Sequence, residues 1–356
     1  MTGGKETRTM LILLPLLLLA LCLWRMGVVK PLFSQLNTDY LSVDRTTSLR
    51  AVLALMVIFG HLALRTDGGG LFSQFSRLGY LAVAVFFFLT GYGLQKQYMT
   101  RRNYAKGFLR KRLLAVGLPY AVVTALYWSY YATQGRVYSL TQIIMAIGAG
   151  SSIVPYSWYI VEVLVFYVVF RLLMGLCRKR HGAMVLGGAV WLAAWTVFCV
   201  VMKYGSWWYI SSLPVVVGMA WAVYEERIIA FLRKYYVPVF IGVLICLGVL
   251  LLLPDRAFAF SWMEDTAKMA ITTLFAVAVV LLMLKIRLGN PVLHYLGQIS
   301  MELYLLQGLA MMLLRSKWLY ITNDLLYCLC VLAADVIMAG ILSIALKGMP
   351  KKKPTR

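Results

Sequence analysis

Long apolar runs alternate with short polar segments along almost the whole chain. A helix needs about 20 consecutive, mostly apolar residues to cross the roughly 30 Å hydrocarbon core of a bilayer. Eleven segments meet this requirement, at residues 10–29, 48–65, 78–97, 113–132, 157–176, 183–202, 207–224, 236–253, 267–285, 295–314 and 325–346. The pattern therefore predicts an all-α, polytopic membrane protein.

Two of these segments are less typical than the others. The second, 48–65, is short. The tenth, 295–314, contains four polar residues, Gln298, Ser300, Glu302 and Gln307. Polar and ionisable groups are costly inside a bilayer, so the ones that occur there are candidates for function. These two segments are therefore the first candidates for a functional site.

Composition supports this class and excludes a water-soluble domain. Hydrophobic residues make up 62% of the 356 positions and charged residues 13%, with a mean hydropathy of +0.80. A single soluble core in a chain of this length could not bury so much apolar surface, so lipid must cover the remainder. The lipid bilayer is the first partner that the sequence predicts.

The net charge of +22, from 35 Lys and Arg against 13 Asp and Glu, would also suit a protein that binds nucleic acid. The basic residues, however, lie in short blocks between apolar runs, which is typical of cytoplasmic loops and argues against nucleic acid. The segment from Lys96 to Arg112 holds seven basic residues and no acidic one, so we expect it to face the cytoplasm. Alternation of the spans then places the C-terminus in the cytoplasm and the N-terminus outside, in a multi-pass protein of the plasma membrane.

We expect three parts in the chain. Residues 1–39 form a signal-anchor helix and linker, 40–346 a ten-helix membrane domain, and 347–356 a basic cytoplasmic tail. The first helix is interpreted as an anchor because no small-x-small cleavage site follows it. The six cysteines lie in or at the ends of apolar spans, so neither a disulfide nor a four-ligand zinc site is expected, and no metal is indicated.

Arg50 and His61 are the strongest candidates for function. They lie eleven residues apart in the second segment. At about 100° per residue, this spacing puts them on one helix face roughly 16 Å apart along the axis. Histidine can act as a general base toward a hydroxyl, because its unperturbed pKa lies near neutrality. The alternative is structural, with a histidine that joins helices and an arginine that reaches the interface.

The Arg50 to His61 spacing is followed in order by four further stretches: Phe86–Tyr92, Phe108–Leu113 with Pro119–Tyr120, Trp158–Glu162 with Phe166–Tyr167, and Leu296–Leu306. Each stretch is a weak signal alone. Together they resemble the acyltransferase 3 family of bacterial membrane O-acyltransferases, over about residues 40–346. The resemblance implies the ten-helix domain that is usual in this family, preceded here by one extra helix.

Members of that family move an acyl group, usually acetyl, from a cytosolic thioester to a hydroxyl of a sugar or lipid-linked glycan. The resemblance therefore implies acetyl-CoA or another acyl-CoA as donor substrate, no permanently bound cofactor, and a carbohydrate or lipid-linked glycan as acceptor. It implies His61 as the catalytic base, directly or through an acyl-histidine. The expected donor-binding residues are Arg50, Arg110 and Arg112, whose guanidinium groups suit phosphate, and Thr90, which stands where the family commonly has Ser.

Four more residues are candidates around the histidine. Glu162, the second catalytic candidate, lies within a span and is expected to orient His61 or to hold sugar hydroxyls, with a structural pairing to a membrane arginine as the alternative. The expected substrate-binding residues are Trp158, Tyr159 and Glu302. Glu302 is favoured over the glutamine five positions later, because the two lie on different helix faces.

Two departures from the family pattern bear on activity. Ala115 stands where the family often has a second arginine, and Gln307 stands where it often has histidine. These departures keep open a catalytically inactive, acyltransferase-like scaffold. A transporter or flippase for a glycan or metabolite is the other alternative, although the sequence shows neither inverted repeats nor paired helices broken by Gly or Pro.

Overall fold

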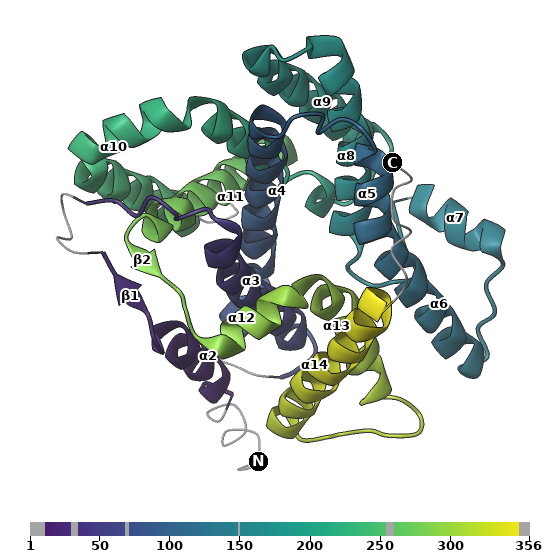
Figure 1. Cartoon of the computed structure of the whole chain (residues 1–356). Coiled ribbons are helices and arrows are strands. Elements are labelled where there is room, and N and C mark those ends of the chain that lie inside the picture. Colours follow the sequence, from purple (N-terminus) through teal and green to yellow (C-terminus); the bar gives the residue numbers. More distant parts are fainter. Residues whose placement is uncertain (1–10, 30–34, 68–70, 149, 254–259, 349–356) are drawn as a thin grey trace.

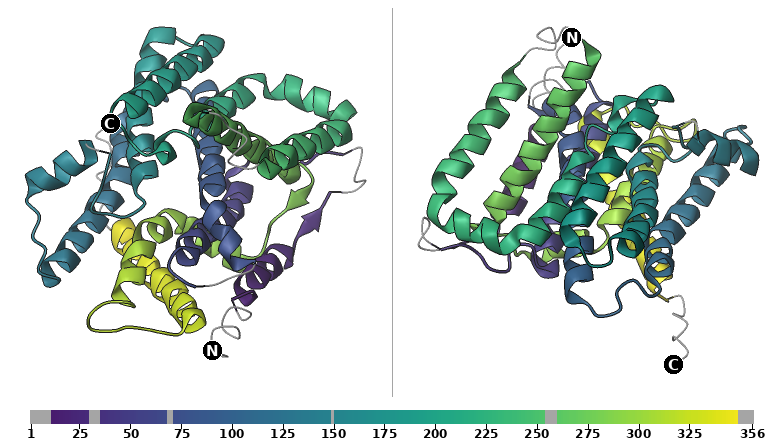
Figure 2. Two further views of the ribbon diagram at one scale, coloured as in Figure 1. Left: turned by 180° about the vertical axis from the view of Figure 1, so that it is seen from behind. Right: turned by 90° about the horizontal axis from the view of Figure 1, so that it is seen from above.

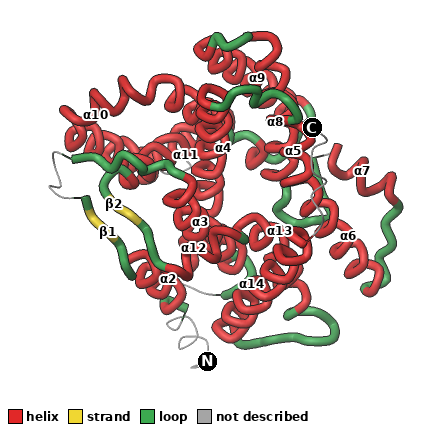
Figure 3. The backbone as a smooth tube through the Cα atoms, viewed as in Figure 1, coloured by secondary structure: helices red, strands yellow, loops and turns green. Residues whose placement is uncertain are grey.

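The computed structural model describes residues 11–29, 35–67, 71–148, 150–253 and 260–348. Helices make up most of this part of the chain, and its two strands, β1 (Gly27–Val28) and β2 (Ile286–Arg287), are two residues long each (Figure 3). The expectation of an all-α polytopic protein is confirmed. The expectations for the N-terminal residues 1–10 and for the lysines of the C-terminal tail lie outside the described residues.

In chain order, the α-helices are α2 (Leu13–Leu23), α3 (Val43–Ala63), α4 (Gly79–Thr100), α5 (Phe108–Arg112), α6 (Leu118–Thr133), α7 (Leu140–Gly148), α8 (Trp158–Cys177), α9 (His181–Val201), α10 (Leu213–Leu252), α11 (Ser261–Met283), α12 (Pro291–Gln298), α13 (Ser300–Leu313) and α14 (Asp324–Gly348). Two 3₁₀ helices, η1 (Phe72–Arg77) and η3 (Ser206–Trp208), and a π-helix, η2 (Leu113–Gly117), complete the set in the described ranges.

Seven of the described helical stretches are long and apolar enough to cross a bilayer: Val43–Ala63, Phe108–Thr133, Trp158–Cys177, His181–Val201, Ser206–Leu252, Ser261–Met283 and Asp324–Leu346. The shorter helices α2 and α13 are also apolar. The first of the seven, α3, is the most enclosed, with 72% of its apolar window buried against 11–44% in the other six. Figure 1 accordingly shows α3 in the middle of the molecule, with helices on every side.

The expected spans 207–224 and 236–253 belong to one helical element, α10. Its backbone leaves helical geometry at Tyr235 (φ −122°, ψ 24°), three residues before Pro238. Proline lacks an N–H, and its ring clashes with the carbonyl four residues earlier, which explains a bend at this place. Figure 2 shows α10 turning back, so that its second arm lies alongside α11.

The expected span 295–314 is interrupted as well. α12 begins at Pro291 and is capped by the side chain of Asn290, which accepts a hydrogen bond from the Leu293 N–H at 2.8 Å. Ile299 (φ −110°, ψ 16°) then separates α12 from α13. The polarity that marks this segment in the sequence therefore accompanies a break in the helix. The expected loop 133–156 also contains a helix, α7, that the sequence did not predict.

Two glycines in the family-like motifs permit close helix crossings. A Cβ on Gly91 of α4 would lie 1.9 Å from the carbonyl oxygen of Val215 in α10. A Cβ on Gly297 of α12 would lie 1.8 Å from the carbonyl oxygen of Thr47 in α3. Since no side chain fits at either crossing, both motifs fix the position of helices that surround α3.

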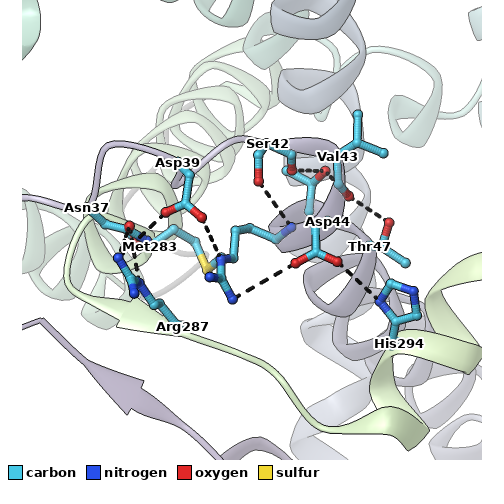
Figure 4. Close-up of polar contacts among 11 residues, drawn as sticks. Asn37, Asp39, Ser42, Val43, Asp44, Thr47, Met283, Arg287 and His294 are labelled. Carbon is cyan, nitrogen blue, oxygen red and sulfur yellow. Dashed lines mark hydrogen bonds and ion pairs between the residues drawn. The ribbon is translucent and has the colours of Figure 1, made fainter.

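A polar network holds the N-terminal end of α3 (Figure 4). Ser42 caps the helix by accepting a hydrogen bond from the Arg45 N–H at 3.4 Å, and Arg45 Nε donates to Asp39 at 3.0 Å. Arg287 donates to Asn37 Oδ1 at 3.0 Å from the strand that precedes α12. Burial alone would raise the pKa of Asp39, but the hydrogen bond and charge of Arg45, together with the charge of Arg287, hold it below its usual value.

The leading helix α2 and strand β1 contact the segment that precedes α12 in the chain, at β2 and Asn290. Strand β1 follows α2 and pairs antiparallel with β2, with Gly27 opposite Arg287. The Asn290 side-chain amide donates to the carbonyl oxygens of Leu21 at 2.6 Å and Trp24 at 3.3 Å. Asn290 therefore caps α12 and holds the end of α2 at the same time.

Candidate active site

A cavity of about 310 Å³ is lined by residues of α3, α4, α8, α13 and the segment around η2. Four of the predicted site residues line it, from four separate parts of the chain: Arg50, Thr90, Arg112 and Tyr159. A second cavity of about 730 Å³ adjoins it and shares the lining residues Val43, Thr46, Leu89, Gly93 and Gln97. The structure thus brings most of the predicted donor-binding residues to one place.

Arg50 has hydrogen-bonding capacity to spare in this cavity. Its Nη2 donates to Thr47 Oγ1 at 2.9 Å, whereas its Nε is buried and has no partner within the described residues. A buried donor without a partner is unfavourable, and a buried cation more so. An anionic ligand in the cavity would remove both penalties.

Arg112 is the second cation of the cavity. It ends α5, where the π-helix η2 begins, and its Nη2 donates to the Tyr104 hydroxyl at 2.7 Å. Its guanidinium also lies 5.8 Å from the ring centres of Phe108 and Tyr167. Aromatic faces hold a guanidinium in place without neutralising its charge. Arg112 is therefore positioned for an anion, while Arg110, on the same short helix, is exposed and does not line the cavity.

Thr90 and Tyr159 form a polar wall of the cavity. The Thr90 hydroxyl donates to the Phe86 carbonyl at 2.9 Å, and the Tyr159 hydroxyl pairs with Thr90. The Tyr159 ring packs edge-on against Phe87 at 4.8 Å and against Tyr304 at 5.7 Å between ring centres. The cavity therefore combines two cations with hydroxyl groups and aromatic surface.

His61 lies farther along α3 and is held by two residues of other elements. Its Nδ1 is 2.9 Å from Gln307 Oε1, and the ring of Tyr156 stacks on the imidazole with 3.5 Å between centres and 11° between planes. Gln307 Nε2 donates to the Tyr304 carbonyl at 2.8 Å, which fixes the direction of the amide and turns its oxygen toward His61. With the amide in this direction, a neutral imidazole donates from Nδ1 to the Gln307 oxygen and keeps its lone pair on Nε2.

Tyr304 connects the cavity with His61. Its side chain lines the cavity, its hydroxyl donates to the Tyr156 carbonyl, and its own carbonyl receives the Gln307 amide. Both of these partners contact His61. One residue of α13 therefore contributes to the wall around Arg50 and to the support of the imidazole.

Residues 45–344 match the family model of acyltransferase 3, described as an acyltransferase domain. The chain belongs to the acyltransferase 3 family. Comparisons with curated proteins and with solved structures found no match. The matched range leaves out the leading helix α2 and includes α3 from Arg45 onward, so the cavity and His61 both lie within the acyltransferase domain.

The remaining predicted residues of this acyltransferase lie outside the lining of the 310 Å³ cavity. Glu162 on α8 is fully buried beside Ser212, and neither of its carboxyl oxygens has a hydrogen bond of normal geometry in the described structure. The Trp158 ring packs against Trp208 and Phe87, at 6.4 and 6.3 Å between centres. Glu302 is buried in α13, on a face different from that of Ser300, Met301 and Tyr304, which line the cavity.

Sequence reasoning missed the residues that hold His61 in the acyltransferase. It expected Glu162 as the orienting residue, whereas the hydrogen-bond partner of His61 in the structure is Gln307. Gln307 is a polar residue within an apolar segment, and this polarity is the signal in the sequence that points to it. Tyr156 lies before α8, in a stretch with no distinctive pattern, and nothing in the sequence marks it.

The sequence analysis did not select Asp335 either, although an ionisable side chain in the middle of the apolar segment 325–346 is a signal for function. It is fully buried in α14, and neither side-chain oxygen has a hydrogen-bond partner among the described residues. Its charge would act on Tyr127, a fully buried residue of α6. Among the described residues, no group of three or more His, Cys, Asp or Glu side chains lies close enough together to hold a metal ion.

Proposed function

We propose that this acyltransferase transfers an acyl group, in the first instance acetyl, from acyl-CoA to a hydroxyl of a sugar, glycan or lipid-linked acceptor. The observation that carries the proposal is the support of His61: the Gln307 oxygen lies 2.9 Å from Nδ1, so a neutral imidazole that donates to it keeps its lone pair on Nε2 for use as a base. Three observations favour this reaction: the chain belongs to a family of acyltransferases, the His61 imidazole is held by neighbouring residues, and Arg50 and Arg112 line a cavity in the same domain.

Arg50 and Arg112 would bind the donor. The phosphates of CoA are anionic and suit guanidinium groups, which donate hydrogen bonds in pairs. Arg50 brings an unpaired donor to the cavity, and Arg112 brings a charge held by aromatic rings. The adjoining cavity of about 730 Å³ offers room for the remainder of a large donor. The thioester end would then extend along the Tyr159 and Tyr304 wall toward His61.

The chemical step would use His61 Nε2 as general base. Nε2 takes the proton of the acceptor hydroxyl, the hydroxyl oxygen bonds to the thioester carbonyl carbon, and the carbon–sulfur bond breaks. The CoA thiolate leaves and takes up the proton from the imidazolium, so that the products are the acyl ester and free CoA thiol. A two-step route, in which Nε2 first accepts the acyl group, uses the same nitrogen and gives the same products.

The test is release of CoA thiol from acetyl-CoA by the purified protein in lipid nanodiscs, with a panel of sugar acceptors. We expect acceptor-dependent thiol release that falls by about 100-fold or more in His61→Ala, the size of a general-base contribution. His181→Gln changes another histidine that lies outside the site and serves as the matched control. Movement of a labelled sugar across the membrane without thiol release would favour the transporter, and equal activity of His61→Ala and wild type would contradict the proposal.

A further inference from the structure

Arg65 lies four residues after His61 and two residues past the end of α3, on the side away from Arg50. Because Leu64 keeps α-helical backbone angles (φ −74°, ψ −12°), the Arg65 and His61 side chains come to nearly the same face. The Arg65 side chain is half-buried, hydrogen-bonded to Tyr156 and close to Tyr127 and Tyr327. It is near enough to His61 for the two charges to interact. A cation therefore stands next to the histidine on the side opposite the donor cavity.

Arg65 has no carboxylate counter-ion among the residues that the structure describes. No carboxylate of the described residues lies within 4.0 Å of the Arg65 guanidinium, although such pairs form elsewhere in the same region. Arg315, which donates to the Arg65 carbonyl, is itself paired with Asp324 and lies 3.9 Å from the ring centre of Tyr327. Of these two neighbouring arginines, Arg315 has a counter-ion, whereas the described side chains around Arg65 are those of tyrosines and His61.

Tyr156 joins Arg65 to His61. It is hydrogen-bonded to Arg65, and its ring stacks on the imidazole. Its φ of +66° lies in the left-handed region, which is unfavourable for a tyrosine. Strained backbone of this kind persists where surrounding contacts hold it and is often associated with function. The geometry thus keeps the cation, the phenol and the base in a fixed relation.

Tyr127 and Tyr131 lie near Arg65, and Tyr130 and Tyr138 pack against Tyr131. The rings of Tyr127 and Tyr131 are 6.5 Å apart, those of Tyr130 and Tyr131 5.8 Å, and those of Tyr131 and Tyr138 5.5 Å between centres. The charge of Arg65 also reaches Tyr131. Tyrosine offers a flat apolar face with a hydroxyl at its edge, a combination that suits the stacking of a sugar ring, and Tyr131 and Tyr138, unlike the buried Tyr127, are partly exposed.

We propose that Arg65 binds an anionic group of the acceptor, so that the substrate is an acidic glycan or a glycan carrying a phosphate. The proposal rests on the proposed function and names the acceptor class of the same site. The anion pairs with the guanidinium beside Tyr156, which holds a hydroxyl of the same molecule near His61, one turn away. A carboxylate on the sugar and a phosphate next to it share this chemistry, and the experiment separates them.

The experiment measures ligand binding to the purified protein in nanodiscs of phosphatidylcholine, which carries no net charge. The probes are methyl glucuronide, its neutral counterpart methyl glucoside, and glucose 1-phosphate. We expect one or both anionic probes to raise the melting temperature of the wild type in a concentration-dependent way and the neutral probe to have no such effect. A stronger shift with the glucuronide identifies an acidic sugar, and a stronger shift with glucose 1-phosphate identifies a phosphorylated acceptor.

Arg65→Gln should weaken binding of the anionic probe by roughly tenfold or more, the range for a charge-assisted hydrogen bond. Arg65→Lys, which keeps the charge, should retain part of the binding. Arg77→Gln is the matched control, because Arg77 is an exposed cation of η1, near the same end of α3. The inference is overturned if Arg65→Gln binds the anionic probe as well as the wild type does. It is also overturned if the wild type binds glucuronide and glucoside equally, or binds neither anionic probe.

Acetyl-CoA binding to the same preparations separates this inference from the proposed function. Arg65→Gln should bind acetyl-CoA as the wild type does, which also shows that the variant is folded. If acetyl-CoA does not bind the wild type at all, the proposed function fails whatever the anionic probes do. If acetyl-CoA binds and the anionic probes do not, the function stands and only the role of Arg65 is lost.

Discussion

At the scale of single residues, the support of His61 depends on one amide. Gln307 uses both ends of its side chain, with Oε1 toward His61 and Nε2 toward the Tyr304 carbonyl. A flipped amide would bring its oxygen against that carbonyl oxygen, which is unfavourable. The glutamine therefore selects one imidazole tautomer. The histidine that the family often has at this position would have to select it with a ring nitrogen instead of an amide oxygen.

Replacement of Gln307 by Leu should lower kcat and leave the KM for acyl-CoA nearly unchanged. The reason is that the variant frees the imidazole to adopt either tautomer without touching the donor cavity. Outer partners of metal-bound histidines offer a guide, and their loss changes activity by roughly 10- to 100-fold. Gln307→Glu keeps an acceptor for Nδ1 and should retain more activity than Gln307→Leu. A rise in KM with constant kcat would instead assign Gln307 to donor binding.

Donor binding provides a second test at this scale. Arg50→Ala and Arg112→Ala should each raise the KM for acyl-CoA, while kcat falls less, because the guanidinium groups bind phosphate away from the reacting carbonyl. The loss of a charge-assisted contact corresponds to about 1.5–3 kcal/mol, or roughly 10-fold or more in affinity. Arg101→Ala, an exposed residue at the end of α4, is the control. Unchanged KM values in both cavity variants would remove these residues from the donor site.

At the scale of elements, the site depends on how α12 and α13 approach α3. The crossing at Gly297 brings α12 against the backbone of α3 at Thr47, one turn from Arg50. The break at Ile299 then redirects the chain, so that α13 presents Tyr304 and Gln307 to the cavity and to His61. A straight helix through this segment would place those two side chains differently.

Gly297→Ala should destabilise the protein, because the new methyl group would overlap the Thr47 carbonyl oxygen and push α12 away from α3. Overpacking of this kind costs about 1–3 kcal/mol. Gly242→Ala in α10 is the matched control, since nothing lies within 4 Å of an added Cβ there. Thermal unfolding in detergent should show a lower melting temperature for the first variant and no loss for the second. Equal melting temperatures would mean that the two helices separate without penalty.

The network at the start of α3 predicts a dependence on pH. The pKa of Asp39 is lowered in the folded protein, so its contribution to stability is present above its unfolded pKa and is lost as the pH falls through the folded value. Because Asp39 is 44% exposed, the contribution should stay below about 1 kcal/mol. The wild type should therefore be slightly more stable than Asp39→Asn at pH 7, and the difference in melting temperature should shrink as the pH approaches 3. A constant difference would show that the charge of Asp39 is not involved.

At the scale of the whole molecule, the proposed function assigns the two ends of α3 to the two sides of a membrane. Arg50 and Arg112 lie toward the beginning of α3, and Arg65 lies at its far end. Since acyl-CoA is cytosolic, the proposed function requires the Arg50 end to face the cytoplasm. The basic segment from Lys96 to Arg112 belongs to the same end and agrees with that orientation.

A fusion of green fluorescent protein or alkaline phosphatase after Gly348 tests the orientation. Green fluorescent protein is expected to fluoresce there and the phosphatase to be inactive, because α14 would end in the cytoplasm. The same phosphatase inserted after Lys317, between α13 and α14, should be active. The opposite pattern would place the donor cavity outside the cell and would be incompatible with acyl-CoA as the donor.

The sequence predicted the membrane class, most of the helices and four residues that share the cavity, because each of these follows from local hydropathy or short motifs. It also separated the two arms of α10, which meet at the kink at Tyr235, but it did not predict the break at Ile299. Hydropathy registers only how apolar a stretch is, not whether its backbone bends. The pairing of His61 with Gln307 joins residues 246 positions apart, so it depends on packing that no local pattern contains. The expectation that Glu162 orients the histidine failed to anticipate this pairing for the same reason.

Asn290 holds the end of α2 with its amide nitrogen and caps α12 with its amide oxygen. The leading segment therefore supports the helices that lead to the proposed site around His61. If residues up to Trp24 were removed, the two backbone carbonyls that hold the Asn290 amide would be lost, while its oxygen would still cap α12. The Asn290 side chain would then rotate more freely, and α12 and the following helix α13 would pack less firmly against α3. Residues that lie wholly outside the acyltransferase domain would in this way govern how steadily the imidazole is held.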